Sequence, residues 1–150
     1  FGMIMSGFEG ERLVLAVMAC CHARLLFDEA REWGHGRRAF GQPLLAFQVW
    51  QHRLADVLTR IEAAEALTLR GIDLYVGGRA APSEISMAKL FATETTRRTA
   101  AECAQILGGQ GYMEGSLVGR LHRDALAMTI GAGSSAIMRE LISRSNNLVA

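Results

Sequence analysis

The sequence lacks an excess of charge of either sign, an abundance of aromatic residues and any long apolar run. Its 16 Lys and Arg residues nearly balance 15 Asp and Glu residues, so the net charge of +1 indicates neither a nucleic acid nor an anionic membrane as partner. Aromatic residues make up 7% of the chain, too few to predict stacking platforms for single-stranded bases. No apolar run approaches the roughly 20 residues that cross a bilayer, and no secretory leader pattern is present. We expect no nucleic-acid partner, no membrane span and no secretion.

Cysteine and histidine are scarce and lack the spacing of metal ligands. The three cysteines lie within helical patterns, which indicates free thiols in the core, in a reducing compartment. Glu32 and His35 form one Glu-x-x-His element, whereas a di-iron bundle needs two such elements and two further glutamates. Signatures of serine hydrolases and of phosphate-binding P-loops are absent as well. The sequence therefore predicts no metal site.

Helical periodicity, interrupted by Gly and Pro, accounts for most of the chain. With 150 residues, 50% of them hydrophobic, the chain is long enough for one domain with a substantial core. Apolar residues recur every three to four positions, while strand-like alternation is short and weak. We predict helices over about residues 10–35, 43–76 and 82–107, a short helical piece at 119–128, and a last helix from about residue 134. Short connections between such helices predict an all-α fold, an antiparallel up-and-down four-helix bundle.

Two predicted helix starts, far apart in the sequence, carry the candidate chemistry. Residues 131–136 supply backbone N–H groups that can bind a phosphate or a carbonyl oxygen, although the dinucleotide fingerprint they match formally needs a preceding strand. Glu11 and Arg12 place a carboxylate beside a guanidinium. Ordinary helix capping explains either segment when it is considered alone. Arg37 and Arg38 precede an ordered turn and are either an exposed basic pair or a phosphate site.

Five short motifs are spread along nearly the whole chain. In order, they are Met5-Ser6-Gly7 leading to Glu11-Arg12-Leu13-Val14-Leu15-Ala16; Arg37-Arg38-Ala39-Phe40-Gly41-Gln42 with Phe47-Gln48; Gln105-Ile106-Leu107-Gly108-Gly109-Gln110-Gly111-Tyr112; Arg123-Asp124-Ala125; and the segment from Ile130 to Ile137. In this order they resemble the C-terminal helical domain of the acyl-CoA dehydrogenase family. The family implies a subunit with an N-terminal helical domain, a β middle domain and this bundle. Residues 1–9 would then be the tail of the segment leaving a missing middle domain, and residues 10–150 the bundle.

The resemblance implies FAD-dependent oxidation of an acyl-CoA to the 2-enoyl-CoA, in which a carboxylate removes the α-proton and the flavin accepts the β-hydride. Many members carry that carboxylate in a Tyr-Glu-Gly-Thr segment, which aligns with residues 131–134 here. Ala132 replaces the glutamate and cannot accept a proton. A branch typified by isovaleryl-CoA dehydrogenase has Gly-Ala-Gly there and takes its base from the helix that Glu11 opens. Glu11 is therefore the predicted base, and Arg12, Gly131 and Ala132 are the predicted substrate-binding residues.

The family resemblance also assigns FAD contacts and partners. An arginine suits paired phosphate oxygens, and glycines allow close approach of the backbone to the cofactor. In the family some of these groups reach the flavin of a neighbouring subunit, which implies a homodimer or homotetramer. The electron acceptor would be an electron-transfer flavoprotein, and the location the bacterial cytoplasm or the mitochondrial matrix. The residues assigned to FAD are Arg37, Gln48, Gln105, Gly108, Gly109, Ser134 and Ser135.

Two alternatives stay open. The bundle would be a non-catalytic oligomerisation module, or it would belong to an acyl-CoA oxidase or flavin-dependent monooxygenase on the same scaffold. The isolated chain is expected to be inactive in either case, because a complete flavin and acyl pocket needs the other domains.

Glycine at position 131 and a methyl group at position 132 leave volume near the reacting carbons, which favours a short or branched acyl chain.

Overall fold

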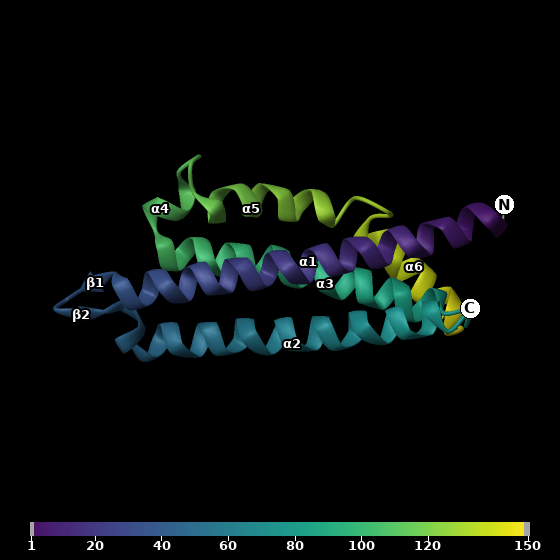
Figure 1. Cartoon of the computed structure of the whole chain (residues 1–150), viewed down its shortest axis with the longest axis horizontal. Helices are drawn as coiled ribbons and strands as arrows, with labels where there is room; N and C mark the ends of the chain where they lie inside the picture. The colour runs from purple at the N-terminus through teal and green to yellow at the C-terminus, as the bar shows by residue number, and fades with distance from the viewer. Residues whose placement is uncertain (1, 149–150) are drawn as a thin grey trace.

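Three long helices run along the molecule and form its frame (Figure 1). The computed structural model describes residues 2–148, with side chains from residue 8 onward. Helix α1 (Gly2–Gly36) is followed by α2 (Gln48–Val76) and α3 (Pro82–Leu107), each antiparallel to the one before it. The fourth position is shared by α5 (Leu117–Met128), which runs beside α3, and α6 (Ser135–Ser145), which packs against the beginning of α3. The predicted all-α, up-and-down bundle is confirmed.

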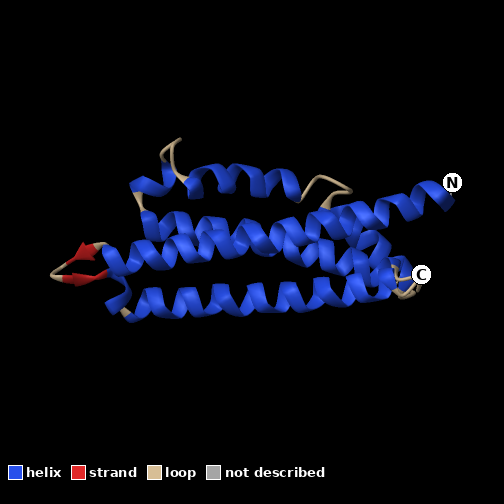
Figure 2. Cartoon of the chain, viewed as in Figure 1, coloured by secondary structure: helices blue, strands red, loops and turns tan. Residues whose placement is uncertain are grey.

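Short elements join the helices at one end of the bundle. A hairpin of β1 (Arg38–Ala39) and β2 (Gln42–Pro43) follows α1, and its two strands are the red arrows of Figure 2. A 3-10 turn, η1 (Leu44–Ala46), then leads into α2, so this helix begins later than the sequence predicts. The single-turn helix α4 (Gly109–Tyr112) links α3 to α5 where the sequence predicts only a break. None of these additions changes the bundle.

The start of α1 is the largest departure from the predicted boundaries. The helix begins at Gly2 instead of near residue 10, because Gly10 does not interrupt it. Gly10 lies against the end of α2, where an added Cβ would come 3.2 Å from the Tyr75 hydroxyl. The glycine that seemed to mark a boundary is therefore a position of close helix approach.

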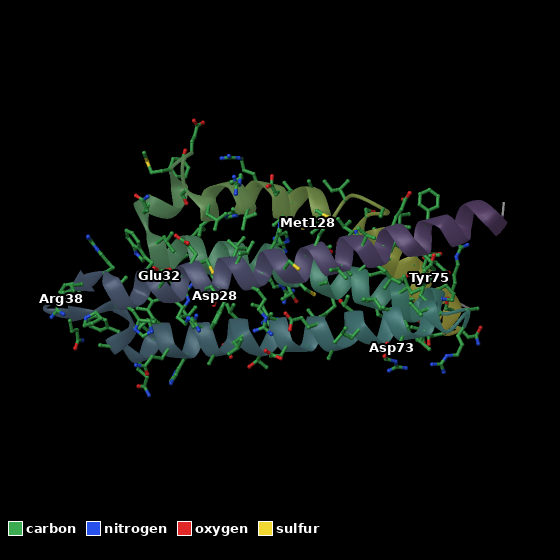
Figure 3. The ribbon with its side chains drawn as sticks, viewed as in Figure 1. Asp28, Glu32, Arg38, Asp73, Tyr75 and Met128 are labelled. Carbon is green, nitrogen blue, oxygen red and sulfur yellow. The ribbon has the colours of Figure 1, made fainter. Side chains whose placement is uncertain are left out.

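The core is built from small side chains where α1 meets α3 and from larger ones near the hairpin end. Ala16, Ala19 and Ala92 are fully buried, and this absence of bulk lets the two helices approach closely. Met128 extends from α5 toward α1 and covers this alanine contact (Figure 3). Thr96 adds a buried hydrogen bond, because its hydroxyl donates to the Ala19 carbonyl at 2.7 Å. Within residues 2–148, no helix is long and apolar enough to span a membrane.

Candidate active site

The connection between α5 and α6 is a bend with unusual backbone geometry. Ala132 has a φ of 52° and Gly133 a φ of 106°, so both occupy the region that favours glycine. Ser134 caps the start of α6, and its hydroxyl accepts a hydrogen bond from the Ile137 N–H at 3.4 Å. The bend is closed by the Ser135 N–H, which donates to the Thr129 carbonyl at 3.0 Å. The predicted glycine-rich helix start is therefore a strained bend, which we call the 129–135 bend.

Helix α1 reaches this bend through Arg12. The Arg12 Nε donates to the Ala132 carbonyl at 3.3 Å, across 120 positions of sequence. Arg12 is 5% exposed, and this burial lowers the pKa of its guanidinium. The negative charges of Glu9 and Glu11 raise that pKa, but by less than burial lowers it. The structure thus brings together two segments that the sequence singled out separately.

Glu11 directly precedes Arg12 in α1 and is exposed to solvent. Val14 and Met18 follow it at helical spacing on the same face of α1, and they are 63% and 44% exposed. Ile130, at the start of the bend, is another exposed apolar side chain, at 62%. The carboxylate therefore heads an uncovered apolar stripe, which is the kind of surface that an acyl chain or another domain covers.

Gly131 and Ala132 supply backbone rather than side chains to the site. An added Cβ at Gly131 would lie 3.6 Å from Leu15 Cδ2, so this glycine faces α1. Among the described residues, none accepts a hydrogen bond from the Ala132 N–H. A donor without a protein acceptor, next to a carboxylate-bearing helix, can bind the oxygen of a carbonyl ligand.

Two residues of α3 that the sequence reading missed also hold the bend. Lys89 is completely buried, and its Nζ donates to the Gly133 carbonyl at 2.7 Å and to the Thr129 carbonyl at 3.4 Å. Glu94 accepts from the Ser135 hydroxyl at 2.7 Å. Burial opposes ionisation of Glu94, but hydrogen bonds from Ser135 and Arg97 outweigh it and lower the pKa. The available signal for Lys89 was a cation on the buried face of a predicted helix, where lysine is rare.

The remaining predicted cofactor residues lie at the other end of the bundle. Arg37 and Gln48 flank the hairpin, while Gln105, Gly108 and Gly109 belong to the connection between α3 and α4. In Figure 3, Arg38 marks this hairpin end of the bundle and Tyr75 marks the opposite end. Helix α5 alone, with its 12 residues, separates α4 from the 129–135 bend by about 18 Å.

The two sets of predicted cofactor residues therefore lie apart within a single chain. An added Cβ at Gly108 or Gly109 would meet no atom within 4 Å, so the backbone at this end faces open space. Among the side chains that the structure describes, no group of three or more His, Cys, Asp or Glu could hold a metal ion.

Comparison with known proteins identifies the family. The family model for "Acyl-CoA dehydrogenase, C-terminal domain" matches residues 1–146. A probable acyl-CoA dehydrogenase of Bacillus subtilis, YngJ, is 36% identical over 96% of this chain and 38% of its own length. Mitochondrial long-chain specific acyl-CoA dehydrogenase of Sus scrofa is 34% identical over 96% of this chain and 34% of its own length. Mitochondrial isovaleryl-CoA dehydrogenase of Oryza sativa is also 34% identical, over 95% of this chain and 35% of its own length.

A solved structure agrees with these relatives. Butyryl-CoA dehydrogenase from Megasphaera elsdenii superposes with a TM-score of 0.96 at 30% identity, over 98% of this chain and 38% of that one. The chain thus spans little more than a third of the length of the proteins it matches. Equal identity to the long-chain and isovaleryl enzymes favours neither branch. The chain belongs to the acyl-CoA dehydrogenase family, in which it corresponds to the C-terminal domain.

Proposed function

We propose that this chain is the C-terminal domain of an FAD-dependent acyl-CoA dehydrogenase in which Glu11 is the catalytic base. The contact between Arg12 and the Ala132 carbonyl carries the proposal, because it brings the part of α1 that holds Glu11 and Arg12, about three turns into the helix, beside the 129–135 bend. The Glu11 carboxylate would remove the α-proton of the acyl-CoA, and the electron pair left behind would spread onto the thioester oxygen. The Ala132 N–H would donate to that oxygen and stabilise the enolate.

The assignment of the base to α1, as in the isovaleryl-CoA dehydrogenase branch, rests on the residues themselves. Ala132 has no ionisable group, while Glu11 is exposed at the head of an apolar stripe. That stripe would contact the acyl chain, with Gly131 and the Ala132 methyl leaving room for a short or branched substrate. Residues 1–9 would lead in from a middle domain, and the other domains of the complete protein would cover the exposed stripe.

The residues fit FAD as a cofactor shared between subunits. When bound, FAD would accept the β-hydride of the substrate. The exposed Arg37 would bind its pyrophosphate, and the open backbone at Gly108 and Gly109 permits close approach of the cofactor. Ser134 and Ser135 lie toward the opposite end of the bundle, which favours contacts to one flavin from two different chains. We therefore propose a homodimer or homotetramer, with Gln48 and Gln105 also lining the cofactor.

A flavoprotein is the proposed electron acceptor. A relative from Acetobacterium woodii, 33% identical over 95% of this chain, is a subunit of a caffeyl-CoA reductase–Etf complex. The proposed location is the bacterial cytoplasm or the mitochondrial matrix. An oxidase or monooxygenase would instead pass electrons to oxygen, so oxygen consumption with an acyl-CoA distinguishes these alternatives from a dehydrogenase.

Flavin bleaching in the full-length protein tests the base. At least one of isovaleryl-CoA, butyryl-CoA and palmitoyl-CoA should bleach the wild-type flavin anaerobically, and the short or branched thioesters should do so faster than palmitoyl-CoA. Glu11→Gln should bind FAD normally but lose bleaching by at least about 100-fold in rate, because the α-proton has no acceptor. Glu9→Gln is the matched control, since it removes a neighbouring carboxylate near Arg12 and should leave bleaching unchanged.

Each result has a separate meaning. Normal bleaching of Glu11→Gln would remove Glu11 from the mechanism while leaving the dehydrogenase activity intact. Failure of all three acyl-CoA thioesters to bleach the wild type would instead contradict the dehydrogenase assignment and favour an oligomerisation module.

A further inference from the structure

Lys89 is a buried cation whose position the packing of the bundle does not explain. It is the largest of the fully buried side chains, although an ammonium group is costly to remove from water. Among the described residues, no carboxylate lies within ion-pair distance of it. Its hydrogen bonds go to two backbone carbonyls of the 129–135 bend. Burial and the nearby positive charge of Arg12 lower the pKa of Lys89, and the negative charge of Glu94 opposes this only in part.

Two cations from different helices hold successive carbonyls of the bend. Arg12 on α1 donates to the Ala132 carbonyl, and Lys89 on α3 donates to the Gly133 carbonyl. Ala132 occupies a left-handed backbone conformation that costs a non-glycine residue about 1–2 kcal/mol. Hydrogen bonds from charged donors are strong enough to offset such a cost. The cations therefore stabilise a conformation that the local sequence disfavours.

The conformation of Ala132 sets the direction of its own N–H. Its backbone torsions connect the peptide that carries this N–H to the peptide whose carbonyl Arg12 holds. Lys89 fixes the following peptide at Gly133, and its contact with the Thr129 carbonyl ties that peptide to the end of α5. By holding the Gly133 carbonyl, Lys89 thus limits the directions in which the Ala132 N–H can point. Among the described residues, this N–H has no hydrogen-bond acceptor.

We propose that Lys89 is a positioning residue, which holds the 129–135 bend so that the Ala132 N–H points at the thioester oxygen of an acyl-CoA. This inference rests on the proposed function and deepens it. Lys89 itself does not touch the substrate. It acts through the backbone, so that the donor is in place before charge develops on the oxygen. A buried charge is suited to this task because it orients two carbonyls at once in a region shielded from water.

Substitution of Lys89 in the full-length holoenzyme tests the inference. Lys89→Met retains much of the side-chain length but removes the charge and both hydrogen bonds. We expect kcat to fall between about 10-fold and 100-fold with little change in KM, because the donor is displaced rather than deleted. Lys89→Arg retains a charged donor and should recover part of the lost rate. Thr96→Val is the matched control, because it deletes a buried hydrogen bond on the same helix that goes to α1 and not to the bend.

The carbonyl stretch of a bound thioester separates positioning from folding. The 2-enoyl-CoA product of an acyl-CoA that bleaches the wild type is labelled with ¹³C at the thioester carbon and bound to the oxidised form of each variant, where it does not react, for isotope-edited infrared difference spectra. A hydrogen bond from the Ala132 N–H lowers this frequency. In Lys89→Met the band should shift upward, toward its position in free 2-enoyl-CoA, while Thr96→Val should leave it unchanged.

The outcomes distinguish this inference from the proposed function. An unshifted band together with wild-type kcat in Lys89→Met would overturn the role of Lys89. If Lys89→Met does not accumulate as folded holoenzyme, Lys89→Gln replaces it, because its amide is polar but uncharged and ends one bond short of the ammonium position, and the same two results decide the question. If the wild type is not bleached by any acyl-CoA, the proposed function fails first. If the wild type is bleached and only the Lys89 variants behave normally, this inference alone fails.

Discussion

Substitution of Gly133 by alanine should destabilise the bundle through the 129–135 bend. A φ of 106° is outside the conformations that alanine adopts readily, which costs about 1–3 kcal/mol. The new Cβ would also lie 2.7 Å from Met138 Cε, a fully buried side chain. Relief of that overlap by a shift of the flexible methionine adds roughly 1 kcal/mol. We therefore expect Gly133→Ala to lower the free energy of unfolding by about 2–4 kcal/mol.

Urea unfolding of the chain, followed by far-ultraviolet circular dichroism, measures this loss. Gly36→Ala is the matched control, because its Cβ would meet no atom within 4 Å. That control should unfold within about 1 kcal/mol of the wild type. Addition of Met138→Ala to Gly133→Ala tests the steric part, since the double variant should lose less stability than the sum of the two single losses. A Gly133→Ala variant with the wild-type midpoint would refute the reasoning.

Two further predictions concern the pH dependence of unfolding. Arg24 on α1 binds Glu65 on α2, and its hydrogen bond lowers the pKa of the Glu65 carboxyl group. Both side chains are about a third exposed, so Arg24→Gln should lower the free energy of unfolding by at most about 1 kcal/mol at pH 7. That stabilisation is present above the usual glutamate pKa and is lost as the pH falls through the lowered pKa of Glu65. The urea midpoints of Arg24→Gln and the wild type should therefore converge in acid. A constant difference between them would contradict this prediction. Burial raises the pKa of the Cys103 thiol to about 12, so the folded state keeps a proton that the unfolded state loses, and unfolding free energy should fall by on the order of 1 kcal/mol per unit from about pH 9 upward. Cys103→Ala should reduce this alkaline slope in the same titration, and an equal slope would exclude Cys103 as its cause.

The bounds of the helices were predictable where local chemistry alone decides them. Helix α3 begins at Pro82 and ends at Leu107 as predicted, because proline suits a first turn and the following glycine ends the helix. The start of α1 was predicted wrongly at Gly10. This glycine allows close packing against Tyr75, and such a tertiary contact leaves no mark in the periodicity of the sequence. Helix α4 was missed because its Gly-rich composition disfavours a helix, and packing against α3 and α5 supplies the missing stabilisation.

The candidate site was predictable in its parts but not in its assembly. Sequence motifs singled out Arg12 and Ala132, yet their hydrogen bond depends on how four helices pack. Lys89 was overlooked because a lysine among alanines is usually an exposed interruption of a helical pattern. Only the position of the α5–α6 connection reveals two carbonyls for its ammonium group. The roles of Glu11 and of the cofactor residues remain predictions that rest on the resemblance and on this arrangement.

The contact between Arg12 and Ala132 also bears on the order in which the protein matures. Residue 132 emerges from the ribosome long after residue 12, so α1 is synthesised before the carbonyl that accepts from its Arg12 guanidinium. A link of such high sequence separation closes a very long loop, which is entropically unfavourable until the intervening helices have packed. The pocket for the substrate oxygen would accordingly be among the last features to form, and a truncated chain that ends before α6 should fold much of its bundle without acquiring it.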